Sequence, residues 1–344
     1  MEAHRLALGE YPTPVTRAAA LDGARGTLTI KNDGLTSKGY GGNKVRKLEY
    51  LLAEAERRGA RRVVTVGALG SHHVLATTVF ARARGLRVAA VLCPQPWTAH
   101  AEETLATGLA LGLEVKTAPS MTAVPLVVPT LLRPGDFFVP AGGSSALGAL
   151  GYVDAMRELD EQIRAGELAE PDVIVAALGS GGTVAGLLVG AARYRPGVRV
   201  LGVDVAVSRP VSAAMVAALA LGAARRRGST GGARALLGRL SITGDELGRG
   251  YGWRTSDGDA ATRVAERVGL RLDPTYTAKT FAKCLKLLGF PGFAPAGGQP
   301  PRDRPLRVLY WHTLSATALA PIRGDAPATV PERLRRHFLA PRRG

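Results

Sequence analysis

The chain is 344 residues long, and its 46% hydrophobic and 5% aromatic content predicts an α/β protein large enough for two domains. Two cysteines, no apolar signal segment and no apolar run near the roughly 18 residues of a membrane span predict a cytoplasmic protein without a membrane partner. The formal net charge is +17, but the arginines are spread along the chain rather than gathered on one aromatic-lined stripe, which argues against a nucleic-acid partner.

A glycine-rich turn near the start of the chain delivers one lysine. A short strand is expected over Gly26–Asn32, and Gly41-Gly42 then leads to Lys44. Apolar residues recur at helical spacing directly behind it, at Leu48, Leu51, Leu52 and Ala55. The first turn of a helix and burial both disfavour an ammonium group, so the Lys44 amine is a candidate for Schiff-base chemistry. Taken by itself, Lys44 is equally compatible with a solvated lysine at a helix start.

From residue 48 the pattern alternates between helices and short strands, which is typical of parallel sheets with ligands at the carboxyl ends of the strands. Helices are expected over 48–58, 73–84, 98–110, 150–165, after 183, and over 211–221, 258–268 and 275–288. Strands are expected over 62–67, 87–93, 113–117, 171–178, 198–205 and 306–311, with apolar segments near 124–132 and 136–140. The remaining stretches are a basic surface segment (222–232), a loop (290–304) and a loosely held tail (325–344).

A second glycine-rich turn follows the most apolar of these strands. Gly179, Ser180, Gly181, Gly182 and Thr183 lie between strand and helix, where backbone N–H groups and two hydroxyls could bind a phosphate. The spacing fits neither a Walker loop nor a dinucleotide fingerprint. The alternative is a tight strand-to-helix turn without a ligand.

Three further polar positions stand at strand or helix ends. Ser71 and His72 precede a helix, but no metal-binding pattern or nucleophile elbow accompanies them, so neither a metal centre nor a serine hydrolase is predicted. Tyr276 offers a phenol at a helix start, and Thr313 offers a hydroxyl after the last strand. Each is more often structural when taken singly. Together with Lys44 and the phosphate-binding turn, they suggest pyridoxal phosphate as the cofactor.

Five motifs in this order resemble the D-cysteine desulfhydrase and aminocyclopropane-carboxylate deaminase family. They are GGNKVRKLEY at 41–50, GSHH at 70–73, PAGGSSALGALGY at 140–152, GSGGTVAG at 179–186 and DPTYTAK at 273–279. The resemblance implies pyridoxal-phosphate fold type II, like the tryptophan synthase β chain: two three-layer αβα domains with mostly parallel twisted sheets. It also implies a large cofactor-binding domain from residues 1–47 and 156–344, with a small domain, 48–155, inserted in it.

The resemblance also implies roles for the site residues. Lys44 forms the Schiff base with the cofactor and moves the α-proton, and Lys47 joins the 179–183 loop in holding the phosphate. Ser71 contacts the substrate carboxylate or shuttles a proton, and Tyr276 lines the substrate pocket. Thr313 is the partner of the pyridine nitrogen, where a neutral hydroxyl favours β-elimination.

The chain departs from the family pattern at two places. His72 stands where the family usually carries Asn facing the phenolic oxygen of the cofactor, so His72 must donate in its place or stack on the ring. Leu314-Ser315 replaces the usual Gly-Gly after Thr313. Thr277 matches the desulfhydrases rather than the cyclopropane deaminases, which carry Glu there.

The function that follows is a homodimeric lyase or deaminase that acts on a small amino acid by α,β-elimination, giving a keto acid and ammonia. A racemase or β-replacement enzyme on the same scaffold is the alternative within enzymes. A protein that binds pyridoxal phosphate without turnover is the alternative outside them.

Overall fold

The computed structural model describes residues 3–206, 209–228, 232–294, 304–324 and 329–339. These residues form two compact units, each with its own sheet. The first unit takes the described residues of 1–8, 48–144 and 317–344, and the second takes those of 9–47 and 145–316. Among the described residues, no helix combines the length and the apolar content that crossing a bilayer requires.

The second unit is built on a six-stranded sheet of order β1-β2-β10-β7-β8-β9. All neighbouring pairs are parallel except β1 with β2. The last strand of the chain lies at the centre, since Leu309 is in register with Thr29 of β2 and with Ile174 of β7. The strands are β1 (Val15–Arg17), β2 (Gly26–Asn32), β7 (Val173–Leu178), β8 (Arg199–Asp204), β9 (Leu240–Thr243) and β10 (Leu306–His312).

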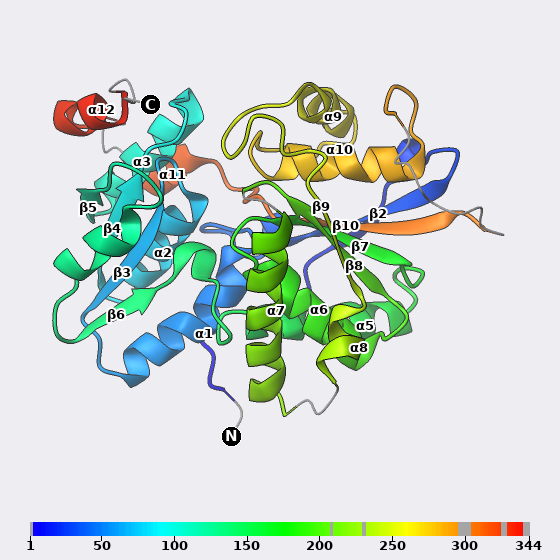
Figure 1. Ribbon diagram of the computed structural model, residues 1–344, viewed down its shortest axis with the longest axis horizontal. Coiled ribbons are helices and arrows are strands. Elements are labelled where there is room, and N and C mark those ends of the chain that lie inside the picture. Colours follow the sequence, from blue (N-terminus) through cyan, green and yellow to red (C-terminus); the bar gives the residue numbers. More distant parts are fainter. Residues whose placement is uncertain (1–2, 207–208, 229–231, 295–303, 325–328, 340–344) are drawn as a thin grey trace. The chain divides into compact units, whose positions relative to one another are not determined.

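Helices cover both faces of this sheet, with α9 and α10 on one face and α5 to α8 on the other (Figure 1). Their bounds are α5 (Leu150–Arg164), α6 (Gly182–Tyr194), α7 (Arg209–Arg226), α8 (Ala233–Leu237), α9 (Ser256–Glu266) and α10 (Thr277–Leu288). Short 3₁₀ turns flank β2, as η1 (Ala19–Leu21) and η2 (Asp33–Leu35). Coverage on both faces explains why β7 reads as an unbroken apolar run.

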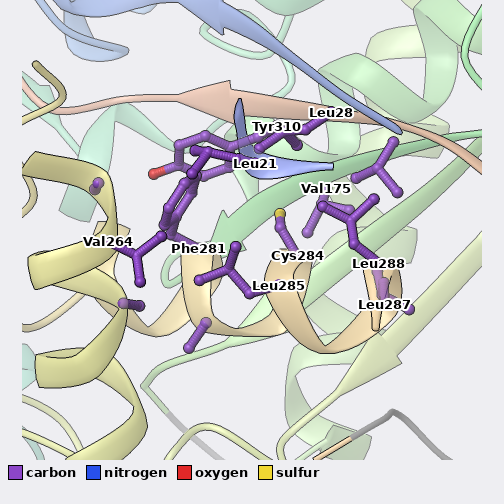
Figure 2. Packing of buried hydrophobic residues seen from close by; sticks show 14 of the residues in the cluster. Leu21, Leu28, Val175, Val264, Phe281, Cys284, Leu285, Leu287, Leu288 and Tyr310 are labelled. Carbon is purple, nitrogen blue, oxygen red and sulfur yellow. The ribbon is translucent and has the colours of Figure 1, made fainter. Parts of the chain in front are cut away.

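The core under α10 follows from its apolar spacing (Figure 2). Phe281, Cys284, Leu285 and Leu288 recur at i, i+3, i+4 and i+7, and all are fully buried. They pack with side chains of the sheet such as Leu28, Val175 and Tyr310. Each large apolar side chain contributes about 1.5–3 kcal/mol when buried, so this layer holds the second unit together.

The first unit contains a four-stranded parallel sheet of order β5-β4-β3-β6. Its strands are β3 (Arg62–Ala68), β4 (Arg87–Cys93), β5 (Leu113–Thr117) and β6 (Asp136–Val139). Its helices are α2 (His72–Ala83), α3 (Ala99–Ala110), α4 (Val124–Val127), α11 (Leu319–Arg323) and α12 (Glu332–Leu339), with 3₁₀ turns η3 (Val128–Thr130) and η4 (Ala141–Gly143). Helix α1 (Lys44–Arg57) begins among residues of the second unit and ends among those of the first.

The expected α/β class with mostly parallel sheets is confirmed, while several boundaries are corrected. Helix α1 begins at Lys44 itself, and α7 continues to Arg226 through part of the expected surface segment. Strand β9 was not expected, because it is only four residues long, although Leu240 and Ile242 alternate with polar residues. The expected tail contains α12, whose Leu334 and Phe338 are buried, so it is not loosely held over that helix. Residues 229–231, 295–303, 325–328 and 340–344 of the expected segments lie outside the described residues.

Candidate active site

The glycine turn before α1 packs directly against the end of β10. Gly42 has φ 97°, and a Cβ atom there would lie 2.8 Å from the Thr313 carbonyl oxygen. The next residue, Asn43, donates its backbone N–H to that same carbonyl at 3.2 Å. A side chain at position 42 would therefore clash with the backbone as well as strain it. The contact places Lys44, the first residue of α1, beside Thr313.

Asn43 also joins the lysine to the second glycine-rich turn. The Lys44 ammonium Nζ donates to Asn43 Oδ1 at 2.7 Å, and Asn43 Nδ2 donates to Thr183 Oγ1 at 3.1 Å. One amide side chain thus bridges the reactive amine and the start of α6. The sequence reasoning missed Asn43, although its place between the Gly-Gly pair and Lys44 was the available signal.

Burial sets the chemistry of the two lysines. Loss of hydration lowers the pKa of Lys44 to about 8, and the negative charge of Asp273 opposes part of that shift. Lys47 is only 2% exposed, and burial together with the positive charge of Lys44 holds its pKa well below the usual value. At pH 7 about one in ten Lys44 side chains is the free amine, the form that attacks a carbonyl. Lys47 is buried and Lys44 partly so, and two lysines in such a place favour an anion beside them.

The turn over residues 179–183 has the geometry of an anion cradle. It joins β7 to α6, and Gly181 at the N-cap has φ 84° and no side chain with which to cap the helix. A Cβ atom at Gly181 would come within 3.2 Å of Leu219 Cδ1 on α7. The helix therefore presents backbone N–H groups that side chains at the N-cap do not cover, where phosphates commonly bind.

Tyr276 closes over the first glycine of this turn. A Cβ atom at Gly179 would lie 3.0 Å from Tyr276 Cε1. The phenol of Tyr276 shares a 2.7 Å hydrogen bond with that of Tyr251, and their rings meet edge to face with centroids 5.8 Å apart. Asp273 orients this segment by accepting the backbone N–H of Tyr276 at 2.7 Å. The sequence reasoning missed Tyr251, which stands between Gly250 (φ 123°) and Gly252 (φ 80°).

A buried ionic network holds the glycine turn before α1 in place. The carboxylate of Asp33 is fully buried and accepts hydrogen bonds from Arg46 Nη2 at 2.8 Å, Tyr152 Oη at 2.6 Å and Trp311 Nε1 at 2.8 Å. Arg46 Nη1 also donates to Glu158 at 2.8 Å. Arg46 lies two residues after Lys44, and Trp311 lies two residues before Thr313. The network therefore holds the first turn of α1 and the end of β10 on one carboxylate.

Ser71 and His72 belong to the first unit. Ser71 Oγ accepts the Val74 N–H at 3.4 Å and so caps α2. His72 Nε2 lies 2.9 Å from Nε2 of His100 on α3, a partner that the sequence reasoning missed. The structure thus gathers Lys44, Lys47, Gly179, Gly181, Thr183, Tyr276 and Thr313 within the second unit, while the roles expected of Ser71 and His72 stay predictions.

An α/β fold that presents a lysine of low pKa beside a glycine-lined anion cradle defines an enzyme that uses a phosphorylated carbonyl cofactor. The family model described as "Pyridoxal-phosphate dependent enzyme" matches residues 6–294. The chain belongs to this family, and its cofactor is pyridoxal phosphate.

Known proteins similar to the chain confirm the resemblance drawn from its motifs. D-cysteine desulfhydrase of Salmonella newport is 33% identical over 338 residues, covering 92% of this chain and 95% of the relative. D-cysteine desulfhydrase of Klebsiella pneumoniae is 34% identical over 330 residues, with the same coverages. A crystal structure titled as an ACC deaminase homologue superposes with a TM-score of 0.75 at 30% identity, covering 90% of this chain and 91% of that one. The fold is therefore pyridoxal-phosphate fold type II.

The residues present fit this cofactor. Lys44 would supply a carbonyl-reactive amine, and Lys47 with the backbone-lined Gly181 turn would hold the phosphate. When bound, pyridoxal phosphate acts as an electron sink that stabilises negative charge developing on a substrate carbon.

Proposed function

We propose that the protein is a lyase or deaminase that acts on a small amino acid and releases a keto acid and ammonia by α,β-elimination. The observation that carries the proposal is the Lys44 amine, whose pKa is about 8 and whose Nζ is held by Asn43 beside Thr183. The names of the relatives support the substrate class, since both are D-cysteine desulfhydrases. The identity of Thr277, Thr rather than Glu, supports elimination from a cysteine-like substrate rather than ring opening.

The proposed roles follow the chemistry of each side chain. Lys44 binds the cofactor and, once released from it, carries the α-proton, which a group of pKa near the working pH does best. Lys47 and residues 179–183, including Ser180 and Gly182, would hold the phosphate, and the Thr313 hydroxyl would be the partner of the pyridine nitrogen. The phenol of Tyr276, held by Tyr251, lines the substrate pocket. Ser71 contacts the substrate carboxylate, and His72 faces the phenolic oxygen of the cofactor.

For a cysteine substrate the balance of the reaction is simple. Loss of the α-proton and of the thiolate at the β-carbon leaves an enamine, and water converts it to pyruvate and ammonia. The thiolate leaves as sulfide once it gains a proton. No oxidant or reductant is consumed, which agrees with a site built from an amine, hydroxyls and phenols.

The test is product analysis with D-cysteine, L-cysteine and D-serine, measuring pyruvate, sulfide and the chirality of recovered substrate. Wild-type protein is expected to form pyruvate from at least one of them, and Lys44→Ala is expected to form none and to lose the visible colour of lysine-bound cofactor. Lys38→Ala is the matched control, because the Lys38 side chain is 89% exposed. Inverted substrate without pyruvate would instead indicate a racemase, and bound cofactor without any product would indicate a protein that does not turn over.

The assembly and location are proposals of the same kind. We propose a homodimer, which the exposed apolar side chains of Met121 (56%) and Leu126 (78%) in the first unit support. We propose a cytoplasmic location, which the buried, unoxidised thiols of Cys93 and Cys284 suit. We also propose that residues 1–47 and 156–344 act as the cofactor-binding domain and 48–155 as the small domain. Light scattering of the purified protein and fractionation of the producing cells would check the first two.

A further inference from the structure

Two histidines from different helices meet at the edge of the first unit. His72 is the first residue of α2, and His100 is the second residue of α3. Their Nε2 atoms lie 2.9 Å apart, with the rings inclined by 38°. His100 is exposed and His72 partly so. Nothing in the proposed elimination uses His100.

The separation of these nitrogens matches that of two neighbouring ligands of a metal ion. With a metal–nitrogen distance of about 2.05 Å, ligands at 90° lie about 2.9 Å apart and tetrahedral ligands about 3.3 Å apart. The observed 2.9 Å therefore suits the right-angled ligand positions of Cu²⁺ or Ni²⁺, which prefer square-planar or tetragonal sites rich in nitrogen. A tetrahedral Zn²⁺ would require the rings to move apart.

The backbone holds the two rings in place. A Cβ atom at Gly70 would lie 2.5 Å from Ala101 Cα, so the starts of α2 and α3 are in direct contact. Both starts are capped by a side chain, that of Ser71 on α2 and that of Thr98 on α3. Two ligands fixed before binding lose little conformational freedom when a metal arrives.

Neutral imidazole is the form that binds metals. Both rings stand in the first turn of a helix. The partial positive charge of the helix starts opposes a divalent ion, so the metal with the greatest intrinsic affinity for imidazole should bind best. That metal is Cu²⁺ in the order of stabilities for divalent ions.

We propose that His72 and His100 form a two-histidine site for a tetragonal divalent cation, Cu²⁺ before Ni²⁺. Among the described residues, no cluster of three or more His, Cys, Asp or Glu side chains is placed to hold a metal ion. Water would therefore complete the coordination. The proposal shares His72 with the proposed cofactor site, but its failure is distinguishable from a failure of the lyase activity, because its test measures only equilibrium binding of an ion to two side chains.

The test is equilibrium dialysis of the holoprotein against Cu²⁺ alone and Ni²⁺ alone. Wild-type protein is expected to bind one ion per chain at this site. His100→Ala should raise the dissociation constant of that ion by about 10–100-fold or more, because losing a direct ligand should cost at least as much as losing a side chain that only supports a ligand. The matched control is His4→Ala, which removes an exposed histidine of the first unit and should leave the constant unchanged.

A spectroscopic readout identifies the ligands. Electron paramagnetic resonance of the Cu²⁺-loaded protein should show two equivalent imidazole nitrogens in wild type and one at most in His100→Gln, a variant that can still form a hydrogen bond with His72. Far-ultraviolet circular dichroism confirms that each variant is folded. Equal affinity in wild type and both His100 variants, or a Cu²⁺ spectrum without two nitrogens, would overturn the proposal and leave the pair as a hydrogen bond alone.

Discussion

The side-chain amide of Asn43 donates a 3.1 Å hydrogen bond to the hydroxyl of Thr183, so the residue before the reactive lysine is tied to the helix that follows the anion cradle. Its other atom, Oδ1, accepts the Lys44 ammonium at 2.7 Å. Residues 140 positions apart thus orient the amine and the phosphate-binding turn together. In the proposed site the cofactor would contact the Lys44 amine and the turn over residues 179–183 together, so the position of one relative to the other matters.

Replacement of Asn43 should therefore weaken cofactor binding without removing the lysine. Two hydrogen bonds of about 0.5–1.5 kcal/mol net each are lost in Asn43→Ala, which corresponds to a rise of roughly 5- to 150-fold in the dissociation constant for pyridoxal phosphate. Titration of the apoprotein with cofactor, followed by visible absorbance, measures it. Asn43→Asp also loses the amide donor but adds a negative charge, so it should raise the pKa of Lys44 where Asn43→Ala does not. An unchanged dissociation constant in both variants would contradict the bridging role.

Cofactor uptake should depend on pH through Lys44. The neutral amine reacts and the pKa is about 8, so the uptake rate of the apoprotein should level off above that pH and fall about tenfold per pH unit below it. Because the negative charge of Asp273 raises this pKa, Asp273→Asn should move the midpoint to lower pH while still accepting backbone N–H groups. Stopped-flow absorbance gives the rates. A midpoint near about 10.4, the value of an ordinary lysine, would show that burial does not act as described.

Gly181, at the N-cap of α6, should be needed for binding pyridoxal phosphate as well as for stability. Gly181→Ala forces a side chain into a left-handed conformation, at about 1–2 kcal/mol, and brings its Cβ within 3.2 Å of Leu219. Gly228→Ala carries a similar backbone penalty at φ 65°, but nothing lies within 4 Å of the added atom. Both variants should lose stability in urea titrations. Only Gly181→Ala should also bind pyridoxal phosphate more weakly, and equal cofactor affinities would argue against the cradle.

The buried network around Asp33 should contribute more to the free energy of unfolding than an exposed ion pair does. Arg46→Met leaves the carboxylate of Asp33 buried without its main counter-charge, which should cost about 3–5 kcal/mol of unfolding free energy. Arg57→Ala removes an ion pair whose arginine side chain is 67% exposed, so solvent screening should make its cost much smaller. Urea unfolding monitored by circular dichroism compares the two. Similar costs for both variants would show that the interior pair is compensated elsewhere.

Much of the fold was readable because its signals are local. The strand Arg87–Cys93 and the helix over 150–164 were expected within one residue, since apolar period and glycine punctuation mark them. The expected place of Lys44 in the first turn of a helix is confirmed. The strand β9 was less accessible, because it depends on its neighbour β8. The resemblance supplied the roles of Lys47, Ser71, His72 and Thr313, which no spacing rule could give.

By itself, the sequence determined most of the order of helices and strands, the two glycine-rich turns and the family, because each is written in a few consecutive residues. Only the tertiary structure decided that Asn43 bridges Lys44 and Thr183, that Tyr251 meets Tyr276, and that His72 meets His100. Such pairs lie far apart along the chain, and their distances depend on how strands pair and helices pack. The depressed pKa of Lys44 belongs to the same class, since it arises from desolvation by surrounding side chains that only folding brings near.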